Sequence, residues 1–314
     1  MNDFLFSLNA TMPVFLLILI GWCLDKSGML TEEFTKVSNK FVFKVALPLL
    51  LFKDIASTDI HQAFDIRFVL FCMISTTICF FGIWGAARLF LKDKSLIGAF
   101  VQGSFRGSAA ILGVAFIQNM YGNSGMAPLM IIGAVPLFNI YSVIVLTIEG
   151  IDQDGSGIKK ACLNILKNPI ILSILAGIMG SLLHIYETLP VIILKPILSL
   201  SSIASPLALL AIGAGFQTGE ALKKVKPACI ATFLKLIGIP GVFMPVAIAL
   251  GFREYDLIAF LIMLGAPTTV TSYIMAVNMK NDGVLSSSIV VISTLLSSVT
   301  LTAWIYILRV WNLI

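Results

Sequence analysis

Long apolar runs alternate with short polar stretches along the whole chain. An apolar helix of about 20 residues crosses the ~30 Å hydrocarbon core of a bilayer, and a continuous helix satisfies its own backbone hydrogen bonds in lipid. The pattern therefore predicts an all-α polytopic membrane protein with ten transmembrane helices. The predicted spans cover residues 5–24, 38–57, 66–90, 95–118, 126–149, 168–186, 192–217, 228–250, 256–278 and 284–309.

The composition agrees with this pattern. Of the 314 residues, 58% are hydrophobic and 12% are charged, whereas soluble domains carry about 25% charged residues. A soluble enzyme, a nucleic-acid-binding protein and a disordered scaffold are thereby excluded. The segment Met1–Leu24 has Asp3 but no Lys or Arg before its apolar run. Because a secretory signal needs a basic start, we expect this segment to be a retained first helix.

The two halves of the chain resemble each other in sequence. Residues 13–21 (PVFLLILIG) align with residues 169–177 (PIILSILAG), and residues 46–51 (ALPLLL) align with residues 204–209 (ASPLAL). The offsets, 156 and 158, are nearly equal, which favours an internal repeat over a chance match between Leu/Ile-rich helices. Since each half holds five spans, the second copy must enter the membrane from the opposite side. Inverted repeats are typical of alternating-access secondary transporters.

We therefore expect a first five-helix repeat over residues 1–149, a loop over residues 150–167 and a second, inverted repeat over residues 168–314. If the N-terminus lies outside, 13 Lys and Arg residues fall in the inner connections and 5 in the outer ones. Basic residues accumulate on the cytoplasmic side. The expected location is thus the inner (cytoplasmic) membrane, with both termini outside and the central loop in the cytoplasm.

Two predicted spans carry helix breakers and hydroxyl groups near their centres. The fourth contains QGSFRGSAAILG and the ninth contains LGAPTTVTSY. An offset of 158 places Gly107 over Gly265, and Pro267 frees backbone carbonyls near Met263 and Leu264. Broken helices expose half-helix ends, whose positive N-termini can hold an anion. The alternative is that these residues form ordinary kinks, with Ser and Thr bound to the helix backbone.

Arg106 is the strongest candidate for a substrate-binding residue. An arginine near a helix centre costs ~2.5–3.5 kcal/mol on insertion scales, and its guanidinium can clamp a carboxylate at two points. A structural pairing, or a side chain that reaches the membrane interface, is the alternative. The polar candidates grouped with it are Ser108, Asn139, Thr268, Thr269 and Ser272. Asn139 can instead bridge helices.

Two further groups of residues complete the candidate site. Pro48, Gly107, Pro206, Gly265 and Pro267 are expected to break helices or to form the crossover between them. Lys44 and Lys235 lie inside predicted spans, where they can compensate charge or extend toward an interface.

Several groups that other membrane functions need are missing. No Asp or Glu lies deep in a predicted span, which gives little support to a carboxylate proton relay or sodium cage. The nearest acidic residues, all at span edges, are Asp54, Glu149, Glu254 and Asp256. His61 and His184 lie in different segments and the five cysteines form no CxxC pair, so we expect no metal and no cofactor. No phosphate-binding loop for ATP is present, and no catalytic set for an intramembrane enzyme can be assembled.

The motifs together resemble the auxin efflux carrier family, specifically its bacterial members, along nearly the whole chain. The resemblance is carried by NKFVFKVALPLLLF at 39–52, KNP at 167–169, ASPLALLAIGA at 204–214 and the segment AP…YIMA at 266–276. It implies a scaffold domain (helices 1, 2, 6 and 7) and a transport domain (helices 3–5 and 8–10). Broken helices 4 and 9 cross in the transport domain, as in the sodium/bile-acid symporter architecture.

Members of this family move organic anions, auxin in plants and malate- or malonate-like acids in bacteria. The resemblance also implies a homodimer. The crossover asparagine of related carriers falls on Ser108 here, and the crossover proline that should follow is absent. Substrate identity therefore does not transfer.

We expect a secondary transporter of small organic anions, mono- or dicarboxylates, that works by elevator-type or rocking alternating access. Transport would be secondary active or driven by the membrane potential. The main alternative is an importer of an organic acid coupled to Na⁺ or H⁺. The alternative from another class is a non-transporting membrane sensor or scaffold. The expected partners are the anion and the lipid bilayer, with no nucleic acid.

Overall fold

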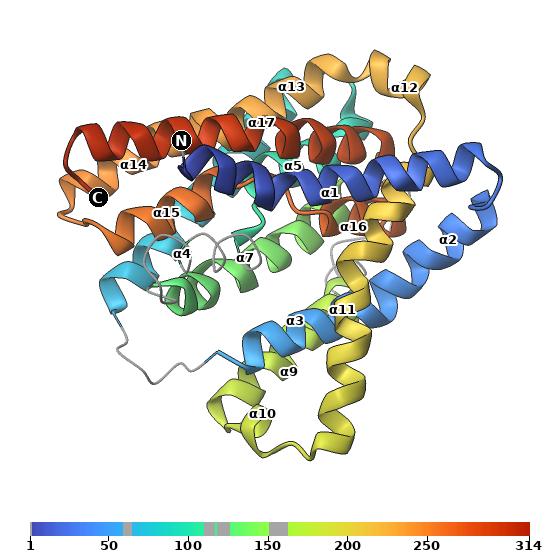
Figure 1. Ribbon diagram of the computed structural model, residues 1–314, viewed down its shortest axis with the longest axis horizontal. Coiled ribbons are helices and arrows are strands. Elements are labelled where there is room, and N and C mark those ends of the chain that lie inside the picture. Colours follow the sequence, from blue (N-terminus) through green and yellow to red (C-terminus); the bar gives the residue numbers. More distant parts are fainter. Residues whose placement is uncertain (1, 59–64, 110–116, 118–125, 151–162) are drawn as a thin grey trace.

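The computed structural model describes residues 2–58, 65–109, 117, 126–150 and 163–314, which are almost entirely helical (Figure 1). The α-helices in chain order are α1 (Asn2–Lys26), α2 (Glu32–Phe41), α3 (Leu47–Ala56), α4 (Ile66–Phe90), α5 (Ile97–Phe105), α7 (Ala127–Ile148), α9 (Pro169–Leu182), α10 (Ile185–Thr188), α11 (Val191–Ala214), α12 (Thr218–Lys223), α13 (Val225–Phe233), α14 (Ile239–Ala249), α15 (Tyr255–Gly265), α16 (Thr271–Asn278) and α17 (Gly283–Val310). Two π-helical turns, η1 (Val42–Ala46) and η4 (Leu234–Gly238), and one 3₁₀ turn, η2 (Lys94–Leu96), join some of them.

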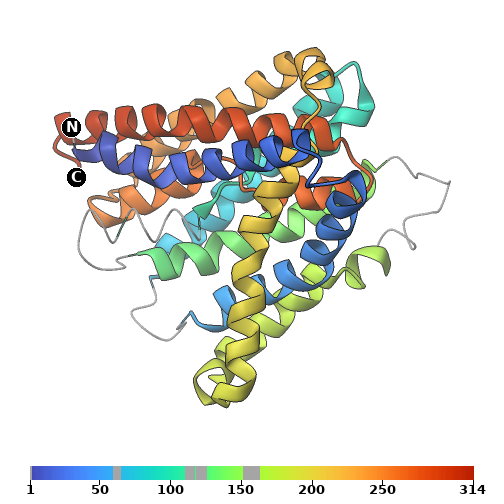
Figure 2. The ribbon, with the colours of Figure 1, turned by 45° about the vertical axis from the view of Figure 1, so that its right-hand side comes forward.

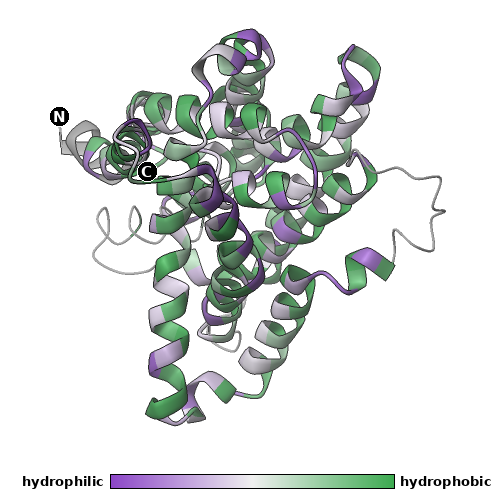
Figure 3. Ribbon diagram, turned by 90° about the vertical axis from the view of Figure 1, so that its right-hand side faces the viewer, coloured by the Kyte–Doolittle hydropathy of each residue, from purple (hydrophilic) through white to green (hydrophobic). Residues whose placement is uncertain are grey.

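Five continuous helical stretches are long and apolar enough to cross a membrane. They are α4, α7, α11, α17 and the run from Val225 to Ala249. Large apolar side chains are exposed on the outer faces of these helices, Phe81, Ile192 and Val299 among them, and Figure 3 shows how hydrophobic residues dominate the ribbon. Exposed apolar surface of this extent marks contact with lipid. The prediction of an all-α membrane protein is thus confirmed.

Three helices follow predicted spans closely. The predicted span 66–90 coincides with α4, and the predicted spans 126–149 and 284–309 correspond to α7 and α17. Residues 110–116 and 118–125, which include most of the second half of the fourth predicted span, lie outside the described residues, as do residues 151–162 of the expected central loop.

The helices pack in pairs through small residues. The helix α1 packs against α11 and α3 against α9, while α4 packs on α7 and α13 on α17; Figure 2 shows α1 crossing close to α11. A Cβ on Gly21 would lie 2.4 Å from the Leu210 carbonyl oxygen, and one on Gly213 would lie 2.0 Å from that of Ile18. Glycine at such contacts lets membrane helices approach closely.

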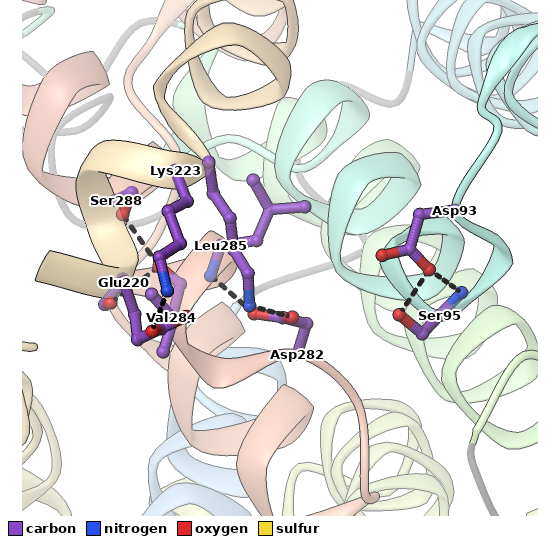
Figure 4. A network of polar contacts seen from close by, with 10 residues as sticks. Asp93, Ser95, Glu220, Lys223, Asp282, Val284, Leu285 and Ser288 are labelled. Atoms are coloured by element: carbon purple, nitrogen blue, oxygen red, sulfur yellow. Dashed lines mark hydrogen bonds and ion pairs between the residues drawn. The ribbon is translucent and has the colours of Figure 1, made fainter.

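Polar contacts fix the helix ends near the predicted inner connections (Figure 4). Asp282 caps α17 by accepting from the Leu285 amide at 2.7 Å, and it pairs with Lys224. Asp93 accepts hydrogen bonds from the hydroxyl and the amide of Ser95, which lower the pKa of the Asp93 carboxyl. Both carboxylates thus cap the start of a helical segment, Asp282 for α17 and Asp93 for η2.

Two predicted helix breaks take a different form. Pro206 was expected to break a helix, but α11 continues through it from Val191 to Ala214. Loss of a single N–H is tolerated in a membrane helix whose neighbours and local adjustments satisfy the freed groups. Pro48 lies in the first turn of α3, where a missing N–H costs least, and the irregularity precedes it as the π-helical turn η1.

Candidate functional site

The interrupted fourth and ninth predicted spans meet at their breaks. The helix α5 ends at Phe105, after which Arg106 is extended, with φ −85° and ψ 119°. The helix α15 ends at Gly265, and the chain stays non-helical until α16 begins at Thr271. The two breaks contact each other through an isolated antiparallel bridge between Gly107 and Thr268.

Local chemistry holds the two breaks together. The Ser108 amide donates to the Pro267 carbonyl at 2.9 Å. The Thr268 hydroxyl donates to the Gly103 carbonyl at 2.6 Å, and the Thr268 amide donates to the Ser293 hydroxyl at 3.1 Å. These bonds satisfy backbone groups that interrupted helices leave without partners. Thr268, expected to touch substrate, is therefore engaged in joining the two breaks.

Arg106 is buried, with 4% of its surface exposed. Its Nη2 donates to Asn139 Oδ1 at 2.7 Å and to Thr271 Oγ1 at 2.8 Å, while Nη1 donates to Met275 Sδ at 2.6 Å. All three acceptors are uncharged, and a thioether is a weak acceptor. Within the described part of the chain, the ion pairs within 4.0 Å do not include Arg106. A buried guanidinium whose partners are uncharged can bind an anion that compensates its charge.

A cavity lies beside Arg106. It holds about 450 Å³ of space free of protein atoms, part of which is open to the outside. Its polar lining consists of Asp54, Arg106, Ser108, Asn139, Thr269 and Thr271. Its apolar lining comes mainly from α3 and α7, with Leu47, Leu50, Leu51, Val135 and Phe138.

The cavity brings together part of the predicted set. Of the candidate substrate-binding residues, Arg106, Ser108, Asn139 and Thr269 line it, as does Gly107 from the group of predicted helix breakers. Of the others, Ser272 is buried away from it with no hydrogen-bond partner for its hydroxyl among the described residues. The predicted residues outside its lining are Pro48, Pro206, Gly265, Pro267, Thr268, Ser272, Lys44 and Lys235.

Two polar lining residues, Asp54 and Thr271, were not among the candidates. Asp54 was assigned to a span edge, yet it lines the cavity and pairs with Lys53 at 2.8 Å. The spacing of Leu47, Leu50, Leu51 and Asp54 places them on one face of a helix. This spacing is the feature of the sequence that could have indicated Asp54 as a lining residue. Thr271 holds Arg106 and lies two positions beyond the predicted Thr269.

The two lysines predicted inside spans differ sharply. Lys44, in η1, is exposed and does not line the cavity. Lys235, in η4, is 0% exposed. Its Nζ donates to the carbonyls of Leu264 at 2.7 Å, Met263 at 3.2 Å and Phe105 at 3.4 Å. Basic side chains thus lie on both sides of the contact between the two breaks, Arg106 facing the cavity and Lys235 behind it.

Comparison with known proteins places the chain in a family. The family described as "Membrane transport protein" matches residues 6–305. An uncharacterized transporter of Methanothermobacter thermautotrophicus is 26% identical over 97% of this chain and 99% of its own length. A Rhizobium meliloti protein named "Putative malonate transporter" is 26% identical over 95% of this chain and 94% of its own. The uncharacterized transporter YfdV of Escherichia coli is 24% identical over 97% of this chain and 98% of its own. The chain therefore belongs to the auxin efflux carrier-like family of membrane transport proteins.

Proposed function

We propose that the protein is a secondary transporter of small organic anions, specifically mono- or dicarboxylates. The observation that carries the proposal is Arg106, a buried cation at the cavity whose described partners are an amide, a hydroxyl and a thioether. Hydrogen bonds between charged partners are roughly twice as strong as those between neutral groups. A carboxylate in the cavity would therefore displace the thioether and accept a hydrogen bond from Nη1 of Arg106.

The cavity offers further groups for such an anion. Ser108 and Thr269 place hydroxyl groups in the lining, and both can donate to a carboxylate oxygen. The helix α16 begins at Thr271, so the positive end of its dipole is close to the cavity. The apolar side chains of α3 would contact the carbon skeleton of the acid.

The position of the cavity supports an alternating-access mechanism. One wall comes from α3, which belongs to the expected scaffold domain. The other walls come from residues 106–109, α7 and residues 269–271, which belong to the expected transport domain. A movement of one domain against the other, by elevator-type or rocking motion, would change the side from which the site is reached.

The packing of the helices supports the inverted repeat on which this mechanism depends. Gly21 and Gly177 are aligned by the sequence repeat, and each lies at a close helix contact. A Cβ on Gly21 would meet Leu210 in α11, and one on Gly177 would lie 3.0 Å from the Cβ of Ile55 in α3. The pairing of α1 with α11 is thus repeated in the pairing of α9 with α3. The start of α1 and the end of α17 also lie near one another in both views (Figures 1 and 2), as expected for two termini on the same side of the membrane.

The relatives bear on the substrate class. The Rhizobium relative named for malonate is similar over almost the whole chain, which favours a small dicarboxylate. With the cytoplasm negative, uncoupled anion movement runs outward, since each charge gains ~2.3 kcal/mol per 100 mV. Import would require a coupled cation. The non-transporting sensor or scaffold remains the alternative from another class.

Counterflow in proteoliposomes tests the proposal. Vesicles preloaded with unlabelled malonate, malate or indole-acetate would be diluted into the labelled acid, in parallel for the wild type, Arg106→Ala and Lys44→Ala. We expect saturable exchange of at least one acid, and at the half-saturating concentration of the wild type Arg106→Ala should lose most of this exchange while Lys44→Ala keeps it. Exchange that survives Arg106→Ala would remove Arg106 from the site. Absence of exchange for every acid would overturn the carboxylate transporter and favour the sensor or scaffold.

A further inference from the structure

Lys235 lies at the point where two helices end. The carbonyls of Phe105, Met263 and Leu264 that accept from its Nζ belong to the last turns of α5 and α15. The last carbonyls of a helix have no partner within the helix, and together they form the negative end of the helix dipole. Two such ends converge on one buried nitrogen.

The number of hydrogen-bond acceptors around Lys235 Nζ fits the protonated form of the side chain. An ammonium group has three N–H donors and no acceptor, and Lys235 has three carbonyl acceptors around it. A neutral amine would leave one carbonyl without a donor. In the described residues, no carboxylate lies within ion-pairing distance of Lys235. The carbonyl dipoles therefore stabilise its charge.

The surrounding structure is shaped around this nitrogen. A Cβ on Gly107 would lie 2.8 Å from Lys235 Nζ, so a larger residue at this position would require the lysine or the backbone to shift. The π-helical turn η4 carries Lys235, and the Trp304 indole donates to the Leu236 carbonyl in the same turn at 3.1 Å. The Phe138 ring centroid lies 5.9 Å from Nζ, within range of a cation–π interaction.

In transporters built from discontinuous helices, unwound carbonyls and half-helix C-terminal ends are the groups that coordinate a coupling Na⁺. Here such carbonyls are already occupied by a side chain. We propose that the Lys235 ammonium takes the place of a coupling sodium ion at the crossover, and that the anion is bound and moved without Na⁺. This inference rests on the proposed function for the anion, but the assignment of a resident cation does not depend on the substrate.

Lys235 acts in this proposal as a positioning residue. It is absent from the cavity lining. Its hydrogen bonds go to the carbonyl of Phe105, directly before Arg106, and to those of Met263 and Leu264 at the end of α15. Neutralising the two converging helix ends holds the crossover, and thus Arg106, in the binding geometry. Truncating the lysine would leave a carbonyl-lined space that a small hard cation such as Na⁺ could enter from solution.

The test is thermal unfolding in detergent, at ~0.15 M total salt, with either NaCl or choline chloride. We expect the wild type and Lys44→Ala to unfold at the same temperature in both salts. Lys235→Ala should unfold at a lower temperature in choline chloride and regain about 2–4 °C in NaCl, because an ion that binds only the folded state stabilises it. Lys235→Met should unfold early in both salts, since its side chain fills the space without offering a charge.

Two results would overturn the proposal: a wild type stabilised by Na⁺ over choline, or a Lys235→Ala variant that Na⁺ does not stabilise. If Lys235→Ala does not fold, malonate counterflow of the wild type in Na⁺-free medium decides. An unchanged rate supports the proposal, and a tenfold loss contradicts it. The two proposals can fail separately. If Na⁺ raises the unfolding temperature of Lys235→Ala but the wild type shows no counterflow of any acid, the proposed substrate class is wrong and the proposal for Lys235 is retained.

Discussion

Gly107 and Lys235 come from different halves of the chain and are in van der Waals contact at the crossover. A Cβ on Gly107 would fall 2.8 Å from Lys235 Nζ, 3.0 Å from Lys235 Cε and 3.1 Å from the Met263 carbonyl oxygen. The glycine thus leaves the volume that the ammonium group needs to reach the last carbonyls of α5 and α15. This contact couples the extended segment that carries Arg106 to the lysine behind it.

Gly107→Ala should therefore disturb the crossover. The added methyl group would force Lys235 away from its carbonyls, and overpacking of this kind costs about 1–3 kcal/mol. We expect a lower unfolding temperature in detergent and slower counterflow. Gly82→Ala in α4 is the matched control, because a Cβ there meets nothing within 4 Å. Equal stability of the two variants would contradict the contact.

Replacing Arg106 by a shorter or a differently shaped side chain should lower the affinity for the anion. Hydrogen bonds to charged groups contribute about 1.5–3 kcal/mol, so Arg106→Ala should weaken anion binding by roughly ten- to a hundredfold. Arg106→Lys keeps the charge but loses the planar fork, and it should retain part of the affinity. The half-saturating concentration in counterflow measures both. A Lys variant no better than the Ala variant would show that geometry, and not charge, dominates.

The close contact between α1 and α11 should depend on its glycines. Gly21→Ala would place a methyl group 2.4 Å from the Leu210 carbonyl oxygen, which the helices can accommodate only by moving apart. We expect a loss of about 1–3 kcal/mol in stability, measured as a lower unfolding temperature. Gly85→Ala, where nothing lies within 4 Å, should be neutral. A tolerated Gly21→Ala would mean that this helix pair adjusts without cost.

Local sequence signals predicted the features that are themselves local. Span 66–90 coincides with α4, because hydropathy and a polar N-cap are properties of neighbouring residues. The breaks near Gly107 and Pro267 were expected for the same reason. The partners of Lys235 were beyond prediction, since Phe105 lies 130 residues away in sequence. Thr268 was expected to face substrate, yet it bonds to Gly103, because only the packed structure decides which way a hydroxyl in a break turns.

Asp54 is the charged residue whose position the sequence did not predict, and its role can be tested by charge removal. Its carboxylate lines the same cavity as Arg106 and pairs with Lys53 at 2.8 Å. A negative charge there opposes an anionic substrate. Asp54→Asn should therefore tighten malonate binding several-fold at neutral pH.

The pH dependence follows from the same charge. Acid protonates the Asp54 carboxylate, so the repulsion disappears as the pH falls and wild-type affinity should rise. In Asp54→Asn this part of the pH dependence should vanish. Protonation of malonate itself affects both proteins equally and cancels in their ratio. Asp256→Asn is the control, because Asp256 is absent from the cavity lining. Loss of counterflow in Asp54→Asn, instead of tighter binding, would contradict simple repulsion. It would assign Asp54 a part in translocation, as the proton-coupled alternative requires.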